Sequence, residues 1–418
     1  MFPALVCASK VIPYVLWIHN GIQQLIHTYR NMGNSIFKFA TLQFALLAMF
    51  FSCHGQSTTT IGTNPSDGQQ PLSKVSMTTL SATGDTVSEL SNNLMLVYQD
   101  RNNNYWFGSW VDGLYKYDGK YIVRYTTADG LPYNRIDQIL EDKVGNLYFN
   151  TPGVISKYDG QRFTTLKFSS QSSNEWKRGP DDLWFKCMQD SGLVYRYDGQ
   201  ALHRLIFPEI PIGKDFDELF PPAQFTNRSN PYDVYTIYTD SRGNIWFGTA
   251  VFGVCRFDGK SLDWITEEDV TEIHNGPSNG VRSIIEDKDG YFWFSNSLFR
   301  YDIYNNIPGK SKADNQDRSA FTYSREKGVG SLDGVKDGDM VEYMSATKDN
   351  SGTLWIATYG DGVYSYDGGK IAHYTFMDGK RYITIFSIFK DHQGVLWVGT
   401  HDDGVYRFNG KTFERFRP

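Results

Sequence analysis

The residues of this sequence that could bind a ligand are aromatic and acidic side chains in short stretches that differ along the chain. Each stretch follows a run of the type Leu-Trp-Phe-Gly. Aromatic faces can stack on a sugar or a peptide, and neighbouring carboxylates can accept hydrogen bonds from it. Single residues of these types are also common in ordinary solvated loops. The candidate ligand-binding residues are Trp110, Asp112, Phe252, Tyr359, Asp361, His401 and Asp402.

Histidines are the residues to consider for catalysis, because acid–base chemistry of the lyase type needs a histidine and an acid that converge. Only His274, near Glu268 and Glu272, and His401 are expected in variable loops. The sequence indicates no defensible pairing of a histidine with an acid, so we predict no catalytic residue and no cofactor. The remaining histidines after residue 53 are His54, His203, His373 and His392.

Charge and cysteine content exclude some classes of function. The formal net charge is -6 over 418 residues, and nothing indicates the clustered basic face that nucleic acid would require. The run Asp287-Lys-Asp-Gly290 is too short for a calcium loop and lacks the later ligands. Cys187 and Cys255 have no metal-ligand spacing, so we predict no metal site and two buried free thiols. A disulfide between these two cysteines is the alternative.

A sequence unit that occurs seven times must position the candidate residues. Its clearest copy runs from Asp240 to Thr249 as Asp-Ser-Arg-Gly-Asn-Ile-Trp-Phe-Gly-Thr, followed by Gly-Val-Cys-Arg-Phe-Asp-Gly-Lys from Gly253 to Lys260. The mean period of about 46 residues lies in the range of β-propeller repeats. The other copies, three of them degraded, begin at or near Asp100, Asp142, Leu183, Asp287, Asp349 and Asp391.

Local chemistry converts each copy into four strands. An apolar run such as residues 281–285 predicts the first strand. In the Asp-x-x-Gly turn that follows, the aspartate accepts backbone amides and the glycine takes a positive φ. The Leu-Trp-Phe-Gly run, the Gly-Val-Tyr-Arg-Tyr run and the residues after Asp-Gly-Lys predict the other three strands. We therefore predict an all-β fold, a single seven-bladed β-propeller of four-stranded antiparallel blades.

Strand polarity sorts the loops of such a propeller into two rims. The Asp-x-x-Gly and Asp-Gly-Lys turns share the turn rim, whereas the loops after the tryptophan strand and the crossings between blades share the variable rim. Function is more often carried by variable loops on a rigid scaffold. The repeated side chains are predicted to be structural, with tryptophan filling the space between adjacent blades. These structural residues are Trp106, Trp184, Trp246, Trp293, Trp355, Trp397, Asp142, Asp240, Asp287, Asp349 and Asp391.

The N-terminal ninety residues predict export. Lys38 precedes an apolar run, Phe39 to Phe51, which is too short to span a membrane and suits a signal peptide. Ser52-Cys53 then resembles a bacterial lipoprotein signal, in which Cys53 would be acylated; an ordinary cleaved signal peptide is the alternative. We predict a doubtful N-terminal extension at 1–31, a lipoprotein-type signal peptide at 32–52, a flexible tether at 53–93 and the propeller at 94–418.

The repeats resemble the two-component regulator propeller repeat, the unit of periplasmic ligand-binding sensor domains in bacterial hybrid histidine kinases. The resemblance spans residues from about Leu90 to Pro418, through the repeated Asp-x-x-Gly-x-x-Trp-x-Gly-Thr signature. It implies a propeller and, with it, a ligand-binding role. Because the repeats occupy the whole C-terminal part, we expect no kinase within this chain.

We therefore expect a non-catalytic ligand-binding or protein-interaction propeller of the cell envelope, similar to those sensors. Its partner would be a small molecule, a glycan, a peptide or an envelope protein. A lipid on Cys53 would anchor it to a membrane, facing the periplasm or the cell surface, and no nucleic acid would be bound. The alternative is a propeller lyase or hydrolase, because the repeat also resembles that of the streptogramin lyases.

Overall fold

The computed structural model describes the C-terminal four-fifths of the chain with several internal gaps. The chain divides into two units, Met1–Ser76 and Met77–Pro418, and every described residue lies in the second unit. Cys53, His54 and His274 therefore lie outside the described residues. Within the described part, no helix is long and apolar enough to cross a membrane. The described residues are 81–170, 174–187, 192–208, 232–266, 270, 280–297, 299–304, 323–328, 343–378 and 381–418.

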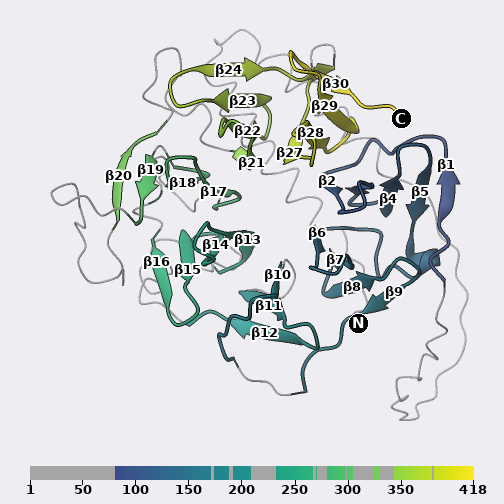
Figure 1. Ribbon diagram of the computed structural model, residues 1–418, viewed down its shortest axis with the longest axis horizontal. Coiled ribbons are helices and arrows are strands. Elements are labelled where there is room, and N and C mark those ends of the chain that lie inside the picture. The colour runs from purple at the N-terminus through teal and green to yellow at the C-terminus, as the bar shows by residue number, and fades with distance from the viewer. Residues whose placement is uncertain are drawn as a thin grey trace, which may run out of the picture. The chain divides into compact units, whose positions relative to one another are not determined.

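Seven antiparallel sheets follow one another around a ring in the order of the chain (Figure 1). The prediction of an all-β, seven-bladed propeller is confirmed. The strands of blades 1 to 3 are β1 (Asp85–Val87), β2 (Leu96–Gln99), β3 (Tyr105–Gly108), β4 (Leu114–Tyr117) and β5 (Ile122–Tyr125); β6 (Gln138–Glu141), β7 (Leu147–Thr151), β8 (Val154–Tyr158) and β9 (Phe163–Thr165); and β10 (Leu183–Lys186), β11 (Leu193–Tyr197) and β12 (Leu202–Ile206).

Blades 4 to 7 each contain four strands, and a short hairpin of β25 (Met377–Asp378) and β26 (Arg381–Tyr382) connects blades 6 and 7. Their strands are β13 (Val234–Thr239), β14 (Ile245–Thr249), β15 (Val254–Phe257) and β16 (Leu262–Ile265); β17 (Ile284–Glu286), β18 (Tyr291–Phe294), β19 (Phe299–Asp302) and β20 (Ser324–Lys327); β21 (Tyr343–Lys348), β22 (Leu354–Thr358), β23 (Val363–Tyr366) and β24 (Ile371–Tyr374); and β27 (Ile385–Lys390), β28 (Leu396–Thr400), β29 (Val405–Phe408) and β30 (Phe413–Arg415).

The innermost strand of each blade is identified by its contacts with the innermost strands of the neighbouring blades. Strands β2, β6, β10, β13, β17, β21 and β27 contact one another in sequence, and β27 contacts β2 again. The strands of a blade therefore run from the inside of the ring to the outside, as the sequence predicts. Apart from β10, each of these innermost strands leads into an Asp-x-x-Gly turn on the turn rim, so its beginning lies on the variable rim. Strand β10 is the tryptophan strand of blade 3, so it is the end of β10 that lies on the variable rim.

The aspartate of each Asp-x-x-Gly turn accepts hydrogen bonds within the turn, and in most blades it also accepts one from the tryptophan indole. In blade 4 one oxygen of Asp240 accepts the backbone amides of Arg242 and Asn244 at 3.0 and 2.8 Å, and Gly243 has φ 81°. The other oxygen accepts the indole N–H of Trp246 at 2.8 Å. The equivalent indole bonds join Trp106 to Asp100, Trp293 to Asp287, Trp355 to Asp349 and Trp397 to Asp391, and in blade 2 the Tyr148 hydroxyl donates to Asp142.

Each tryptophan packs against the blade that follows it. Trp246 of blade 4 lies 4.8 Å, between ring centroids, from Phe292 of blade 5. Trp397 of blade 7 lies 4.6 Å from Tyr105 of blade 1, so the same packing closes the ring. Four more seams are filled by the pairs Trp106–Phe149, Trp184–Phe247, Trp293–Tyr366 and Trp355–Phe408, and Tyr148 packs on Phe185 between blades 2 and 3.

Residues just before β2 complete the closure without exchanging a strand between blades. The amide of Leu94 donates to the carbonyl of Thr400 at 3.2 Å, and the amide of Gly404 donates to the carbonyl of Asn92 at 2.7 Å. Strand β1 pairs with β5 as a fifth, outermost strand of blade 1. This strand lies within residues 53–93, for which the sequence predicts a flexible tether.

Blade 3 departs from the predicted four strands. Among its described residues no strand precedes β10, which corresponds to the tryptophan strand of the other blades. The side chain of Gln138 makes hydrogen bonds to β10 on the side where the other blades have their innermost strand. Its amide N–H donates to the Trp184 carbonyl at 3.2 Å, and its oxygen accepts the Lys186 amide at 3.3 Å. The inner edge of β10 is thereby hydrogen-bonded by a side chain of blade 2.

The two cysteines of the described residues are free and buried. The expectation of buried free thiols is confirmed, and Cys187 and Cys255 do not form a disulfide.

Candidate functional site

Three innermost strands carry a β-bulge at the same place, next to the variable rim. The register shifts between Val234 and Thr236 in β13, and equivalent shifts occur at the second residues of β21 and β27. A bulge inserts one unpaired residue and turns its side chain out of the regular alternation. The three extra residues are Tyr235, Met344 and Phe386.

Phe386 is the residue around which three of the predicted binding residues meet. Its ring centroid lies 5.1 Å from that of Trp110 in blade 1, with the rings nearly perpendicular. It lies 6.0 Å from Tyr359 in blade 6 and 6.0 Å from His401 in its own blade. All four side chains are half-buried. Their convergence follows from the bulge, which places Phe386 between the loops of three blades.

Three cations lie at the variable-rim ends of innermost strands, and one of them contacts this aromatic group. The Arg135 guanidinium lies 4.5 Å from the centre of the Trp110 ring and bonds to the Asp137 carboxylate at 2.7 Å. The Arg282 guanidinium lies 4.3 Å from the centre of the Tyr235 ring. Lys186 ends β10. We call Trp110, Arg135, Lys186, Arg282, Tyr359 and Phe386 the rim cluster.

Charged neighbours shift the pKa values of Lys186 and Tyr359, two members of the rim cluster. Burial lowers the pKa of the Lys186 ammonium group; Asp137 opposes this effect, and Arg135 and Arg282 lower the pKa further. Burial raises the pKa of the Tyr359 hydroxyl, which Arg282 opposes. Both side chains are therefore within electrostatic reach of Arg282, although they belong to different blades.

Phe252, a predicted binding residue, is part of the core. Its side chain is 2% exposed, and its ring lies 4.5 Å from that of Tyr232 within the largest hydrophobic cluster of blade 4. A phenylalanine in this loop is buried because residues 250–252 fold back onto the blade. The structure therefore does not present Phe252 to a ligand.

The three predicted carboxylates each have a local partner outside the rim cluster, although Asp402 lies close enough to Tyr359 to help raise the pKa of its hydroxyl. Asp112 accepts the Ser91 hydroxyl and lies 3.9 Å from Arg124. Asp361 accepts the hydroxyl of Tyr364, and Asp402 forms an ion pair with Arg381. These carboxylates are engaged locally, so they are not acceptors shared by one site.

Two of these carboxylates belong to a repeated loop. A Ser or Thr hydroxyl accepts the amide of the aspartate three residues later, at 2.9 Å for Asp112 and 3.0 Å for Asp361 and Asp403. Asp403, not the predicted Asp402, is thus the equivalent of Asp361, and it likewise accepts a tyrosine hydroxyl, that of Tyr406. The Ser/Thr-x-x-Asp spacing is visible in the sequence and indicates a structural role.

The cations and Phe386 are the residues that sequence reasoning missed. Each lies at the beginning or the end of a strand, where the sequence gives no signal of which side chain turns inward. Among the described residues, no group of three or more His, Cys, Asp or Glu side chains could hold a metal ion.

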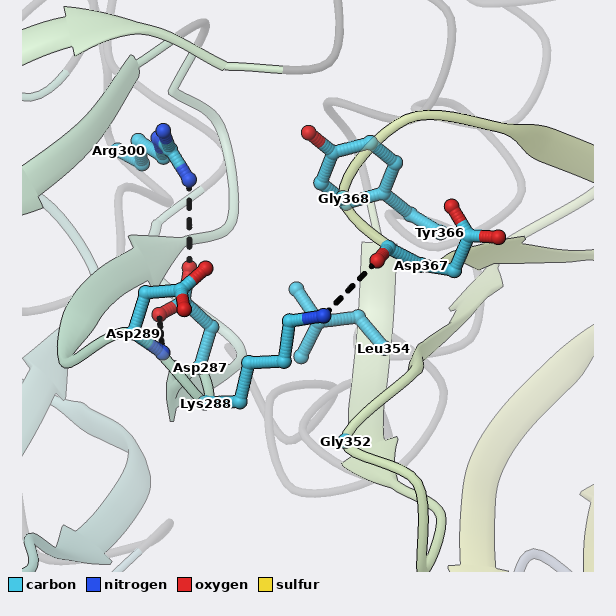
Figure 2. Close-up of a pocket in the computed structure, with 9 residues that line it drawn as sticks. All are labelled: Asp287, Lys288, Asp289, Arg300, Gly352, Leu354, Tyr366, Asp367 and Gly368. Atoms are coloured by element: carbon cyan, nitrogen blue, oxygen red, sulfur yellow. Dashed lines mark hydrogen bonds and ion pairs between the residues drawn. The ribbon is translucent and has the colours of Figure 1, made fainter.

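The crevices between blades lie on the other rim and are structural. Figure 2 shows one between blades 5 and 6, where the Lys288 ammonium donates to the Asp367 carbonyl at 3.1 Å and Arg300 lies 3.7 Å from Asp287. Its free volume is about 10 Å³, room for a single water molecule. A larger crevice of about 170 Å³ between blades 2 and 3 is lined by Asp142, Tyr148 and other turn residues. Both are seams between repeated turns.

Comparison with known proteins agrees with this architecture. The model of the two component regulator propeller family matches residues 229–250, 275–297 and 380–402, which contain the first two strands of blades 4, 5 and 7. No curated protein sequence is significantly similar to this one.

Solved structures share the fold at low sequence identity. A streptogramin B lyase is 11% identical, with a TM-score of 0.52, over 78% of this chain and 95% of its own. Virginiamycin B lyase from Staphylococcus aureus is 13% identical, with a TM-score of 0.51, over 77% and 97%. The extracellular domain of BT4673 from B. thetaiotaomicron, a hybrid two component system, is 19% identical, with a TM-score of 0.48, over 78% and 39%.

The chain spans about 40% of the length of the BT4673 structures that it matches. The lyase structures, in contrast, are matched over almost their whole length, which establishes the propeller and nothing about its chemistry. The repeat itself is assigned by the three matched segments. Three segments of this propeller, in blades 4, 5 and 7, match the two component regulator propeller repeat.

Proposed function

We propose that this propeller is a non-catalytic module of the cell envelope that binds a ligand or a partner protein at the rim cluster, as a sensor domain does. The observation that carries the proposal is the convergence of half-buried aromatic side chains and cations from six blades at one rim. Isolated surface aromatics are common in propeller loops, whereas here Phe386 contacts Trp110, Tyr359 and His401 from three loops. Such preorganised aromatic faces favour ligands with a flat or apolar side.

The same geometry supports binding over catalysis. A lyase mechanism needs an acid beside a histidine, and the nearest predicted acid to His401 in the sequence, Asp402, forms an ion pair with Arg381. The other candidate, His274, lies outside the described residues. Likeness to the lyases rests on the fold alone, so it adds no catalytic residue.

We further propose that the protein is exported and attached by a lipid on Cys53. The short apolar run before Ser52-Cys53 supports this proposal. The ligand classes consistent with the rim cluster are glycans, peptides and small molecules with a ring.

A thermal-shift screen of the full chain against glycans, peptides and metabolites tests the proposal. A ligand present at a hundred times its dissociation constant adds about 2.7 kcal/mol of stability. We expect a saturable shift that Trp110→Ala or Phe386→Ala abolishes. Tyr121→Ala is the matched control, because Tyr121 is 50% exposed in a hairpin of the turn rim. A shift that survives both rim substitutions would refute the location, and turnover of the ligand would refute the absence of catalysis.

A further inference from the structure

Of the three cations of the rim cluster, only Arg135 forms an ion pair among the described residues. Arg135 precedes β6 and bonds to Asp137 at 2.7 Å. Within the part of the chain that the structure describes, neither Lys186 nor Arg282 has a carboxylate within ion-pair distance. Arg282 is held instead by the face of the Tyr235 ring at 4.3 Å. The arrangement therefore gathers more positive than negative charge at one place.

Lys186 is fixed in this place by the hydrogen bonds of its backbone. The Gln138 side chain accepts its amide at 3.3 Å, and the Asn150 side-chain amide donates to its carbonyl at 2.7 Å. The Asn150 carbonyl in turn accepts the amide of Asp137 at 2.8 Å. The end of β10 is thus attached to the beginning of β6, which brings Lys186 beside Arg135 and Asp137.

The position of Lys186 is unfavourable for the protein alone. Its side chain keeps some exposed surface, but enough protein surrounds the ammonium group to lower its pKa. A cation that loses water without gaining an ion pair destabilises a fold. Two further cations nearby add repulsion, and methionine or glutamine would fill the same space without this cost. An anion bound among the three cations would remove the penalty.

The aromatic side of the cluster constrains what the anion is attached to. The guanidinium of Arg135 lies over the Trp110 ring, and Phe386 packs against the same tryptophan at 5.1 Å. A stacked guanidinium keeps its N–H groups in one plane, which suits the oxygens of a carboxylate, sulfate or phosphate. A ring or apolar body would find the half-buried faces of Trp110 and Phe386 beside these oxygens.

Building on the proposed function, we propose that the rim cluster binds an organic anion. Its carboxylate, sulfate or phosphate group lies among Arg135, Lys186 and Arg282, and its ring packs on Trp110 and Phe386. Charge recognition and ring recognition then come from separate side chains. Each can be removed without the other.

The test titrates the full chain with probe pairs that differ only in charge. Oligogalacturonate is compared with its methyl ester, and phenyl phosphate with phenol, by calorimetry and thermal shift. We expect saturable binding of a charged probe only, weakened at least tenfold by Lys186→Met or Arg282→Gln and weakened by added salt. Lys120→Met is the matched control, because Lys120 is exposed in a turn of the opposite rim.

A second measurement needs no ligand. Because the structure shows no carboxylate within ion-pair distance of Lys186 among the described residues, Lys186→Met is not expected to lower the melting temperature of the free protein. A lower melting temperature would show that the lysine is structural and would overturn the inference.

The outcomes separate this inference from the proposed function. If a methyl ester or phenol binds as tightly as its charged partner and Trp110→Ala abolishes both, the anion inference falls and the proposed function stands. If a charged probe binds but loses affinity only in Lys186→Met and Arg282→Gln, charge recognition stands and the aromatic site is wrong. Failure of every charged probe to bind overturns the anion inference.

Discussion

Substitution of Asp240 by alanine tests whether the repeated aspartate stabilises a blade mainly through the tryptophan. Asp240 is 5% exposed and Trp246 is fully buried. Alanine removes the acceptor of the indole N–H at 2.8 Å and of two turn amides at 3.0 and 2.8 Å. A hydrogen bond to a charged group contributes about 1.5–3 kcal/mol, and a buried donor left without an acceptor costs about 1–3 kcal/mol. We expect a loss of about 3–5 kcal/mol in the free energy of unfolding.

Asp118→Ala is the matched control for the turn bonds. Asp118 accepts two amides of its own turn, from Lys120 and Tyr121 at 2.8 and 2.7 Å, but it is exposed and bonds no indole. Water can replace it, so we expect a loss of about 1 kcal/mol or less. The difference between the two variants therefore measures what burial adds together with the side-chain bonds that Asp240 accepts from the Trp246 indole, the Tyr304 hydroxyl and the Asn244 amide.

The assay is urea unfolding followed by tryptophan fluorescence and circular dichroism, with stabilities compared only where the dependence on urea is unchanged. A double-mutant cycle with Trp246→Phe isolates the indole bond, and we expect a coupling of about 1–3 kcal/mol. Equal losses for Asp240→Ala and Asp118→Ala would refute the reasoning. The reasoning would also be refuted if Asp240→Ala lowered the free energy of unfolding by the same amount in the Trp246→Phe background as in the original protein.

Three further predictions concern acid, packing and thiols. Burial alone would raise the pKa of Asp198, but two backbone amides and a neighbouring histidine together lower it to about 2. This value lies below the unfolded value of about 3.9, so the contribution of Asp198 to stability is present above pH 4 and is lost as the pH falls to 2. Thermal melts between pH 5 and 2 should show this loss, and Asp198→Asn should reduce its size; an identical pH dependence would contradict it. Gly248→Ala should destabilise the protein by about 2 kcal/mol or more, because its Cβ would lie 2.3 Å from a backbone oxygen of blade 5, whereas Gly360→Ala meets open space and should be neutral in the same urea assay. A thiol reagent followed by peptide mass mapping should leave Cys187 and Cys255 unmodified in the native protein, because both are buried; rapid native labelling would disprove their burial.

The sequence alone was sufficient for the seven-bladed architecture, but not for the strand numbers of blades 1 and 3. A period of about 46 residues and an Asp-x-x-Gly turn before each Trp-Phe-Gly run fix the strands, because turn chemistry and strand alternation are local properties. The two rims follow from strand order. The sequence also holds the signal that Asp112 and Asp361 are structural, since both follow a Ser or Thr by three residues.

The composition of the rim cluster depended on tertiary structure. Phe386 faces Trp110, Tyr359 and His401 only because a bulge in β27 turns it out of the strand alternation and because closure of the ring brings blades 6, 7 and 1 together. Lys186 approaches Arg135 because no strand precedes β10 among the described residues of blade 3, so Gln138 bonds its edge directly. Local patterns predict which residues form a strand, whereas the side chains that meet at a rim are decided by bulges, by the hydrogen bonds at the inner edge of β10 and by the circular order of the blades.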